Sequence, residues 1–241
     1  MIPLSAPEFA VVLVAVTVGA AVQGSVGFGA NQLAVPVLAV VEPRALPATL
    51  SMWILPLTVA MAVRERHGIE VRNALTIVAW RIPGTVVGAL TVAAVSADTI
   101  STLAGGAVVA AVVVTAGGAT VPINRATTAA AGLASGAMGT ATSIGGPPVA
   151  LLYQRREGPV LRATLAVTFV AGLLISLTGQ AAVGAIEGWH ALLALALLPG
   201  TVVGLAVARV LAHRLDGPWL RPAVLTLAGT AGLVAFLSGL A

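Results

Sequence analysis

Apolar residues run along the chain in long stretches separated by short polar segments. Six stretches reach about the 20 residues that a helix needs to cross a membrane; they are 45–63, 74–95, 99–118, 163–183, 190–210 and 222–240. Two further apolar regions, 8–41 and 126–153, carry clusters of glycine and small polar residues in their middle. Glycine costs about 1 kcal/mol and proline about 3 kcal/mol inside a helix. These clusters therefore predict helices broken at Gly24–Gln32 and Gly136–Pro148.

Short sequence repeats occur in the same order at a nearly constant separation. The sequence PGTVVG occurs at 83–88 and 199–204, and Ala-Thr-Leu occurs at 48–50 and 163–165, offsets of 116 and 115 residues. The two glycine clusters match at an offset of 112 residues. Self-similarity of this kind indicates a duplicated unit. We expect two repeats, 1–120 and 121–241, that together form one membrane domain.

The arginines predict how the chain crosses the membrane. If each broken region returns to the side it entered, ten arginines share one side and Arg44 alone lies opposite. The ten are Arg64, Arg66, Arg72, Arg125, Arg155, Arg156, Arg162, Arg209, Arg214 and Arg221. Cytoplasmic loops carry the excess of positive charge, so this side is cytoplasmic and both termini lie outside. Each repeat then makes an odd number of crossings, and the two repeats are inverted.

The predicted fold is therefore an all-α polytopic membrane protein of the cell (inner) membrane. Each repeat contains a glycine-broken, re-entrant-like helical hairpin and three transmembrane helices. Composition agrees, because 59% of residues are apolar and 8% are charged, whereas soluble domains carry about 25% charged residues. The isoelectric point of 11.3 reflects arginines facing anionic headgroups, so nucleic acid is not an expected partner. The absence of cysteine excludes disulfides and thiolate metal sites.

Broken helices in inverted repeats are typical of transporters, whose substrates bind near the midplane. Short helices after each break, 33–40 and 149–154, would direct free N–H groups at a common point, which suits an anion. The alternative is that the small residues only allow close helix packing. The candidate site residues are Gly24, Ser25, Gly27, Gly29, Asn31 and Gln32 in the first break and Gly139, Thr140, Thr142, Ser143, Gly145 and Gly146 in the second.

Arg81 is the one charged residue predicted inside a crossing, and no Asp or Glu accompanies it there. Cation and proton carriers usually keep a carboxylate at that depth, so an anion is favoured. Arg81 either provides a counter-charge for that anion or extends to the headgroups at the membrane surface. The sequence leaves both interpretations open. Gln23 and Gln180 either line the transport path or bond neighbouring helices.

The motifs GFGAN at 27–31 and SIGGPP at 143–148, with a short basic loop after the second long span, resemble the TauE/SafE family. This family is also called the sulfite exporter or TSUP family, and the likeness covers nearly the whole chain. It implies a membrane transporter for sulfur-containing or carboxylate anions such as sulfite and sulfonates. Ala30, Asn31 and Ser143 stand where the family often has glycine, so the fold should persist while the substrate differs.

We therefore expect an exporter of a small anion in a lipid bilayer, with no cofactor and no metal. A passive anion channel and an importer of a related anion remain alternatives, and a homodimer is an assembly that the sequence leaves open. An enzyme is not expected. An intramembrane serine protease would need a histidine beside a buried serine, and His67, His190 and His213 all fall in loops or at the edges of spans.

Overall fold

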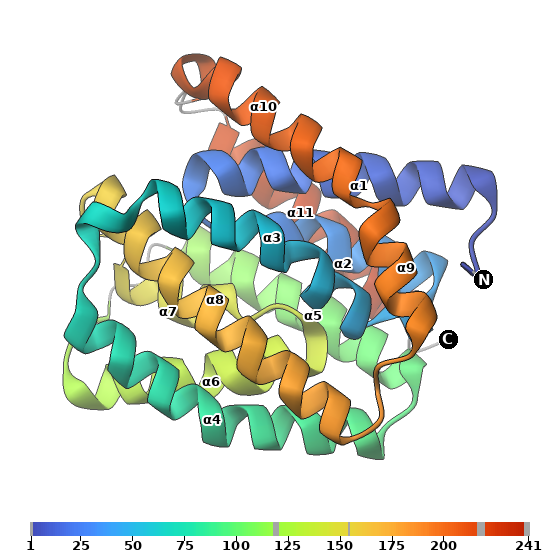
Figure 1. Cartoon of the computed structure of the whole chain (residues 1–241), viewed down its shortest axis with the longest axis horizontal. Coiled ribbons are helices and arrows are strands. Elements are labelled where there is room, and N and C mark those ends of the chain that lie inside the picture. Colours follow the sequence, from blue (N-terminus) through green and yellow to red (C-terminus); the bar gives the residue numbers. More distant parts are fainter. Residues whose placement is uncertain (1, 118–120, 154, 216–219, 239–241) are drawn as a thin grey trace.

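The computed structural model describes residues 2–117, 121–153, 155–215 and 220–238, and these residues contain helices and no strand. Most helices run roughly along one long axis (Figure 1). Up to residue 117 the elements are α1 (Ala6–Val26), α2 (Ala30–Val41), η1 (Pro43–Ala45), α3 (Ala48–Arg64), η2 (Arg66–Gly68), α4 (Val71–Ala94) and α5 (Ala97–Ala116). After them come α6 (Arg125–Thr142), α7 (Gly146–Tyr153), α8 (Gly158–Ala182), α9 (Gly188–Ala196), α10 (Leu198–Leu215) and α11 (Leu220–Ser238).

The outer surface of the bundle is apolar, as a lipid environment requires. Within the described residues, five helical stretches are long and apolar enough to cross a membrane: α1, α4, α5, α8 and the Gly188–Arg209 stretch of α9 and α10. Large aliphatic side chains on these helices face outward, among them Leu75 and Leu90 on α4 and Val202 on α10. The predicted all-helical membrane fold is therefore confirmed, whereas the inverted arrangement of its repeats stays a prediction.

Both glycine-rich regions are broken, but each break is shorter than predicted. The chain leaves the helical conformation at Gly27 and Gly29, where φ is 102° and 112°, and again at Ser143, where φ is 60°. Glycine adopts such positive φ angles without strain. Gly24 stays inside α1 and Gly139 stays inside α6. The short helices after the breaks consequently begin at Ala30 and Gly146, earlier than the sequence predicts.

The two copies of PGTVVG make corresponding contacts between helices. In α4, a Cβ on Gly84 or Gly88 would overlap the backbone of α6, and in α10 a Cβ on Gly200 or Gly204 would overlap α1. Lipid tails are as apolar as aliphatic side chains, so close van der Waals packing between small residues drives helix association in membranes. Each copy therefore packs a helix against the first helix of a broken pair.

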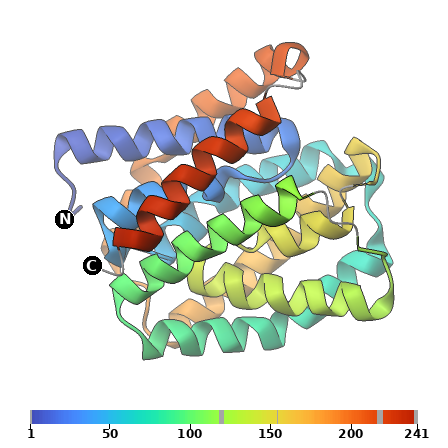
Figure 2. The same ribbon diagram turned by 180° about the vertical axis from the view of Figure 1, so that it is seen from behind.

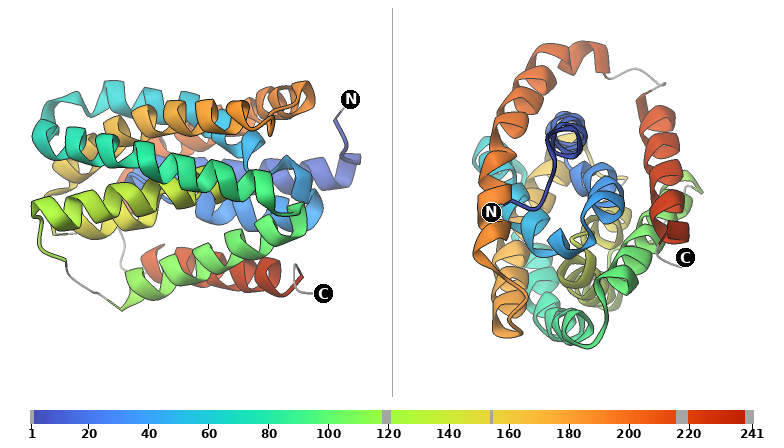
Figure 3. Two further views of the ribbon diagram at one scale, coloured as in Figure 1. Left: turned by 90° about the horizontal axis from the view of Figure 1, so that it is seen from below. Right: turned by 90° about the vertical axis from the view of Figure 1, so that its right-hand side faces the viewer.

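The centre of the bundle is formed by α2, nine of whose 12 residues are buried. The end-on view in Figure 3 shows α2 inside, with α8 to α10 on one side and α5 on the other. From behind, Figure 2 shows α11 lying beside α5, where Gly105 approaches the backbone of Phe236. The helix that begins at the first break is therefore surrounded by other helices.

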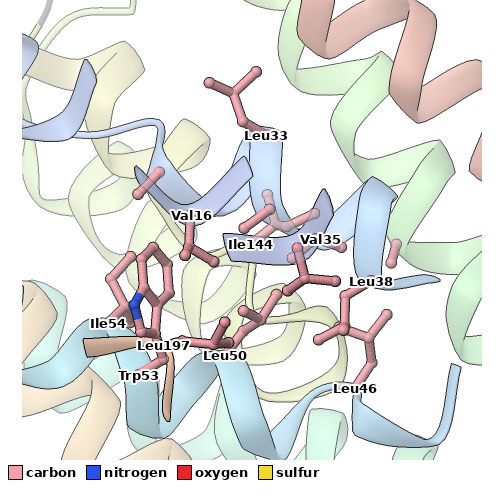
Figure 4. Close-up of a cluster of buried hydrophobic side chains, with 14 of the residues drawn as sticks. Val16, Leu33, Val35, Leu38, Leu46, Leu50, Trp53, Ile54, Ile144 and Leu197 are labelled. Atoms are coloured by element: carbon pink, nitrogen blue, oxygen red, sulfur yellow. The ribbon is translucent and has the colours of Figure 1, made fainter. Parts of the chain in front are cut away.

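A cluster of apolar side chains packs beside the breaks (Figure 4). Trp53 of α3 is fully buried in this cluster and packs with Leu50, Ile54 and Leu197. Its indole Nε1 donates a hydrogen bond of 2.7 Å to Oγ1 of Thr201. Because a buried indole N–H needs an acceptor, this bond fixes α3 against α10.

The apolar stretch 190–210 is not one straight helix. It divides into α9 and α10 at Leu197, two residues before Pro199. Proline disfavours helical geometry in the residue before it and removes a backbone donor. Pro83, the matching proline of the other PGTVVG copy, lies inside the continuous α4. The same motif is therefore accommodated in two ways.

Candidate functional site

A cavity of about 50 Å³ lies where the two breaks meet. We call it the central cavity. Segments on either side of each break contribute to its wall, as do α3, α4 and α8. Its lining residues are Gln23, Phe28, Gly29, Asn31, Gln32, Ile54, Thr58, Arg81, Gly139, Ser143, Ile144, Gly145, Gly146, Pro147, Phe169 and Leu173.

A direct hydrogen bond joins the two breaks. Asn31 donates from Nδ2 to the carbonyl oxygen of Ser143 at 2.7 Å, and the two residues occupy matching positions of the sequence repeat. The Ser143 hydroxyl donates to the carbonyl of Pro47 at 2.7 Å, and it lies 2.9 Å from Oγ of Ser51. These bonds hold Ser143 in its left-handed conformation, in which a non-glycine residue is uncommon.

Gln23 caps the start of α2. Its Oε1 accepts a hydrogen bond from the backbone N–H of Ala30 at 3.2 Å, and its Nε2 donates to Thr58 at 3.5 Å. One of the free N–H groups expected at this helix start is therefore already satisfied. The start of α7 has fewer donors than a typical helix, because Pro147 and Pro148 have no N–H. Free backbone N–H groups at the starts of α2 and α7 therefore contribute less to the site than the sequence predicts.

Arg81 of α4 supplies the positive charge of the central cavity. Its side chain is 2% exposed. Nη1 donates to Oγ of Ser135, which in turn donates to the carbonyl of Gly145 beside the second break. The buried Nε has no partner. An extended side chain reaching the membrane surface is therefore the wrong interpretation of Arg81.

Two glycines make room for the Arg81 guanidinium, and a third makes room for the Arg81 backbone. A Cβ on Gly172 of α8 would overlap Nε, Cζ and Nη2 of Arg81, and a Cβ on Gly139 would lie 3.1 Å from Nη2. A Cβ on Gly136 would overlap the backbone of α4 at Arg81 itself. Small residues on α6 and α8 thus create a slot through which the guanidinium reaches the cavity. The sequence gives no indication of this, since Gly172 lies 91 positions from Arg81.

No carboxylate neutralises Arg81 among the described residues. The ion pairs among the described residues instead join Glu42, Glu65 and Glu70 to arginines that lie near helix ends. An isolated buried charge costs several kcal/mol unless it is paired or hydrogen-bonded. A bound anion would offset this cost, so the arrangement favours negatively charged ligands over cations.

Eight of the predicted site residues line the central cavity, and five do not. Gly24 packs against Ala208, and Gly27 packs against Arg162. The hydroxyls of the other three bond within the protein: Ser25 to Ala21, Thr142 to Met138, and Thr140 to Thr85 and Ser176. Gln180 also lies outside the cavity and donates to Ser51 and to the carbonyl of Thr140.

Several lining residues were not predicted as site residues. Phe28 and Pro147 adjoin the glycines of the breaks, so their positions in the sequence could have indicated them. Ile54, Phe169 and Leu173 come from the middle of long apolar helices. No local signal separates these three from residues that face lipid.

The family model described as "Sulfite exporter TauE/SafE" matches residues 11–235, nearly the whole chain. No curated protein and no solved structure matches the chain. The matched range includes both breaks, both PGTVVG copies and all residues around the central cavity. This agrees with the resemblance carried by the glycine-rich motifs, and the chain belongs to the sulfite exporter TauE/SafE family.

Proposed function

We propose that the chain exports a small anion of the sulfite, sulfonate or carboxylate type, which binds in the central cavity. Membership of the family makes the chain an exporter-type membrane transporter for anions, and the apolar helices make it a multi-pass membrane protein. Because this is a transporter family, the match is consistent with a protein that is not an enzyme. The observation that carries the finer proposal is the buried, carboxylate-free guanidinium of Arg81 at the meeting point of the two breaks.

The lining residues suggest how an anion is held. Arg81 supplies the counter-charge, while Asn31 and Gln32 add polar contacts at the start of α2. Gly139, Gly145 and Gly146 leave space for the anion near the backbone. Phe28, Phe169 and Leu173 form the apolar wall, which lowers the local dielectric constant and strengthens the attraction between the anion and the guanidinium.

The size of the central cavity limits the ligand. A cavity needs roughly 10–15 Å³ to hold one water molecule, so the central cavity, with about 50 Å³, corresponds to three to five water-sized positions. An anion with four non-hydrogen atoms, such as sulfite or acetate, matches this volume. A larger sulfonate requires the cavity to widen.

The proposed direction follows from the charge of the substrate. A negative-inside potential favours the exit of an anion by about 2.3 kcal/mol per charge per 100 mV. No carboxylate lines the central cavity to carry a coupled cation, so export driven by the potential is the simplest mechanism. A passive channel is distinguished by flux that does not saturate with substrate, and an importer by its direction in cells.

The inverted relation of 1–120 and 121–241 is part of this proposal. It is supported by the corresponding contacts of the two PGTVVG copies. The starts of α4, α6 and α8 lie at the same end of the bundle (Figure 1), and we propose that this end is cytoplasmic and the membrane is the cell (inner) membrane. A homodimer finds no support in the family match and is not included.

Substitution of Arg81 tests the function. We expect Arg81→Gln to lose saturable sulfite flux in proteoliposomes, while Arg81→Lys keeps a weaker flux because it retains the charge. Arg209→Gln is the matched control, since Arg209 is an exposed arginine on α10. Folding is checked by thermal unfolding in detergent. Wild-type flux through folded Arg81→Gln, for sulfite and for small carboxylates, would refute the proposed site.

A further inference from the structure

We propose that a second anion site, which binds a phosphate group, lies where α4 and α6 begin. A cavity of about 460 Å³ opens there, and we call it the end cavity. It shares no residue with the central cavity. Its lining residues are Arg72, Asn73 and Thr76 of α4, Arg125 and Thr128 of α6, and Asn124 just before α6.

The end cavity forms because α4 and α6 run side by side in the same direction. Ile77 approaches Gly132 near the start of both helices, and Gly88 approaches Ala137 further along. The parallel course is visible in Figure 3. The first N–H groups of both helices therefore face one end, where they contribute partial positive charge. The side chain of Glu70, the N-cap residue of α4, accepts no hydrogen bond from the backbone N–H groups of the first turn.

The charged side chains of the end cavity are both basic. Arg72 and Arg125 are exposed, and neither takes part in an ion pair within the described residues. The nearby carboxylate of Glu70 is already occupied, because it pairs with Arg156 at 3.1 Å and accepts from Asn73 at 2.7 Å. The cavity wall thus has a net positive charge.

An unsatisfied hydroxyl gives independent evidence for a ligand. Thr128 lines the end cavity but is only 1% exposed, and its Oγ1 has no hydrogen-bond partner. A helical threonine usually donates to the carbonyl four residues earlier, here that of Asn124. That carbonyl already accepts from the hydroxyl of Thr127 at 3.1 Å and from the N–H of Thr128 at 2.9 Å. The Thr128 hydroxyl is therefore free to donate to a ligand oxygen.

A phosphate group fits these donors. It offers several acceptor oxygens and negative charge to two guanidinium groups, a hydroxyl and helix N-termini. The cavity volume lies within the roughly 300–1,000 Å³ range of ligand pockets, so a phosphate ester can enter. On the adjoining face of α4, Val71 is 60% exposed and Leu75 is 65% exposed. This apolar face at a helix end places the phosphate at headgroup depth, which favours an anionic phospholipid over a soluble ester.

Binding to the purified full-length protein in uncharged detergent tests the site. The probes are dioctanoyl phosphatidylglycerol, dioctanoyl phosphatidylcholine and glycerol phosphate, each titrated while thermal unfolding is followed. We expect phosphatidylglycerol to bind the wild type best. In the double variant Arg72→Gln/Arg125→Gln its dissociation constant should rise roughly tenfold or more, as the loss of charged hydrogen bonds predicts. Thr128→Val, which keeps the shape of the side chain, should weaken binding by a factor of about three to ten.

Arg155→Gln is the matched control, because Arg155 is exposed in the turn before α8 but does not line the end cavity. Its dissociation constant should stay within about twofold of the wild type, as expected for an exposed charge. Equal binding of glycerol phosphate, with the same dependence on the variants, would support the phosphate site and identify a soluble ester as its ligand. Equal losses of phosphatidylglycerol affinity in Arg155→Gln and in the double variant would overturn the proposal. So would the absence of binding by all three probes.

Discussion

Replacement of Gly172 by alanine should move the Arg81 guanidinium while leaving the helices in place. The new Cβ would overlap Nε, Cζ and Nη2 of Arg81, all at the far end of a flexible side chain. Carbon atoms normally pack at about 3.5–4.0 Å, so the guanidinium must retreat by at least ~1 Å. The backbone of α8 gains up to about 1 kcal/mol of helix propensity from the change. Thermal stability should therefore hold while the charge moves.

The expected loss of affinity follows from the contact that is removed. A hydrogen bond to a charged group contributes about 1.5–3 kcal/mol, and 1.4 kcal/mol corresponds to a factor of ten. If the displaced guanidinium no longer reaches the anion, the dissociation constant of sulfite should rise roughly 10- to 150-fold. Titration of purified protein by calorimetry measures this rise, and the melting temperature measures folding in the same sample.

Two other glycines provide controls. Gly188 has no atom within 4 Å of the position that a Cβ would occupy, so Gly188→Ala should change neither affinity nor stability. In Gly136→Ala the Cβ would meet backbone atoms of Arg81 and Thr85. Because backbone cannot rotate away, that variant should unfold at a lower temperature. Unchanged sulfite affinity in folded Gly172→Ala would show that the position of the guanidinium does not control binding.

Three further outcomes are expected. In this cysteine-free chain, an impermeant thiol reagent outside the cell should label Gly188→Cys but not Gly158→Cys; the reverse pattern would contradict the proposed orientation. In proteoliposomes, a potassium-diffusion potential of 100 mV should support a roughly fortyfold gradient of a monovalent anion, and flux that instead follows a pH gradient would reveal proton coupling. Trp53→Phe should lower stability by about 1 kcal/mol through loss of the bond to Thr201, and an unchanged unfolding temperature would contradict that value.

The sequence predicts the broken helices because glycine and proline act locally on the backbone. It does not predict where each break falls. Gly24 remains helical. Its missing side chain makes room for Ala208 and Leu205, so packing, and not backbone conformation, requires a glycine there. Ser143 adopts a positive φ although serine rarely does, because tertiary bonds to Pro47 and Asn31 hold it there.

The role of Arg81 also depends on distant contacts. Its depth in the membrane follows from its place in an apolar stretch, and both of its sequence interpretations agree with that depth. What decides between them is the slot formed by Gly139 and Gly172 on two other helices. The division of 190–210 at Leu197 is a similar case, since the matching stretch around Pro83 stays continuous. Helix propensity indicates the positions at which a helix can break, and tertiary packing determines at which of them it does break.

The hydrogen bond from Asn31 to the carbonyl of Ser143 limits the motions available to a transport cycle. Rocking that separated the two breaks would break this bond and leave a buried amide and a buried carbonyl without a partner, at a cost of about 1–3 kcal/mol. Rotation of α4 and α8 around a joined pair of breaks avoids that cost. The joined breaks would then serve as a stationary pivot, and access to each side of the membrane would alternate through movement of the surrounding helices.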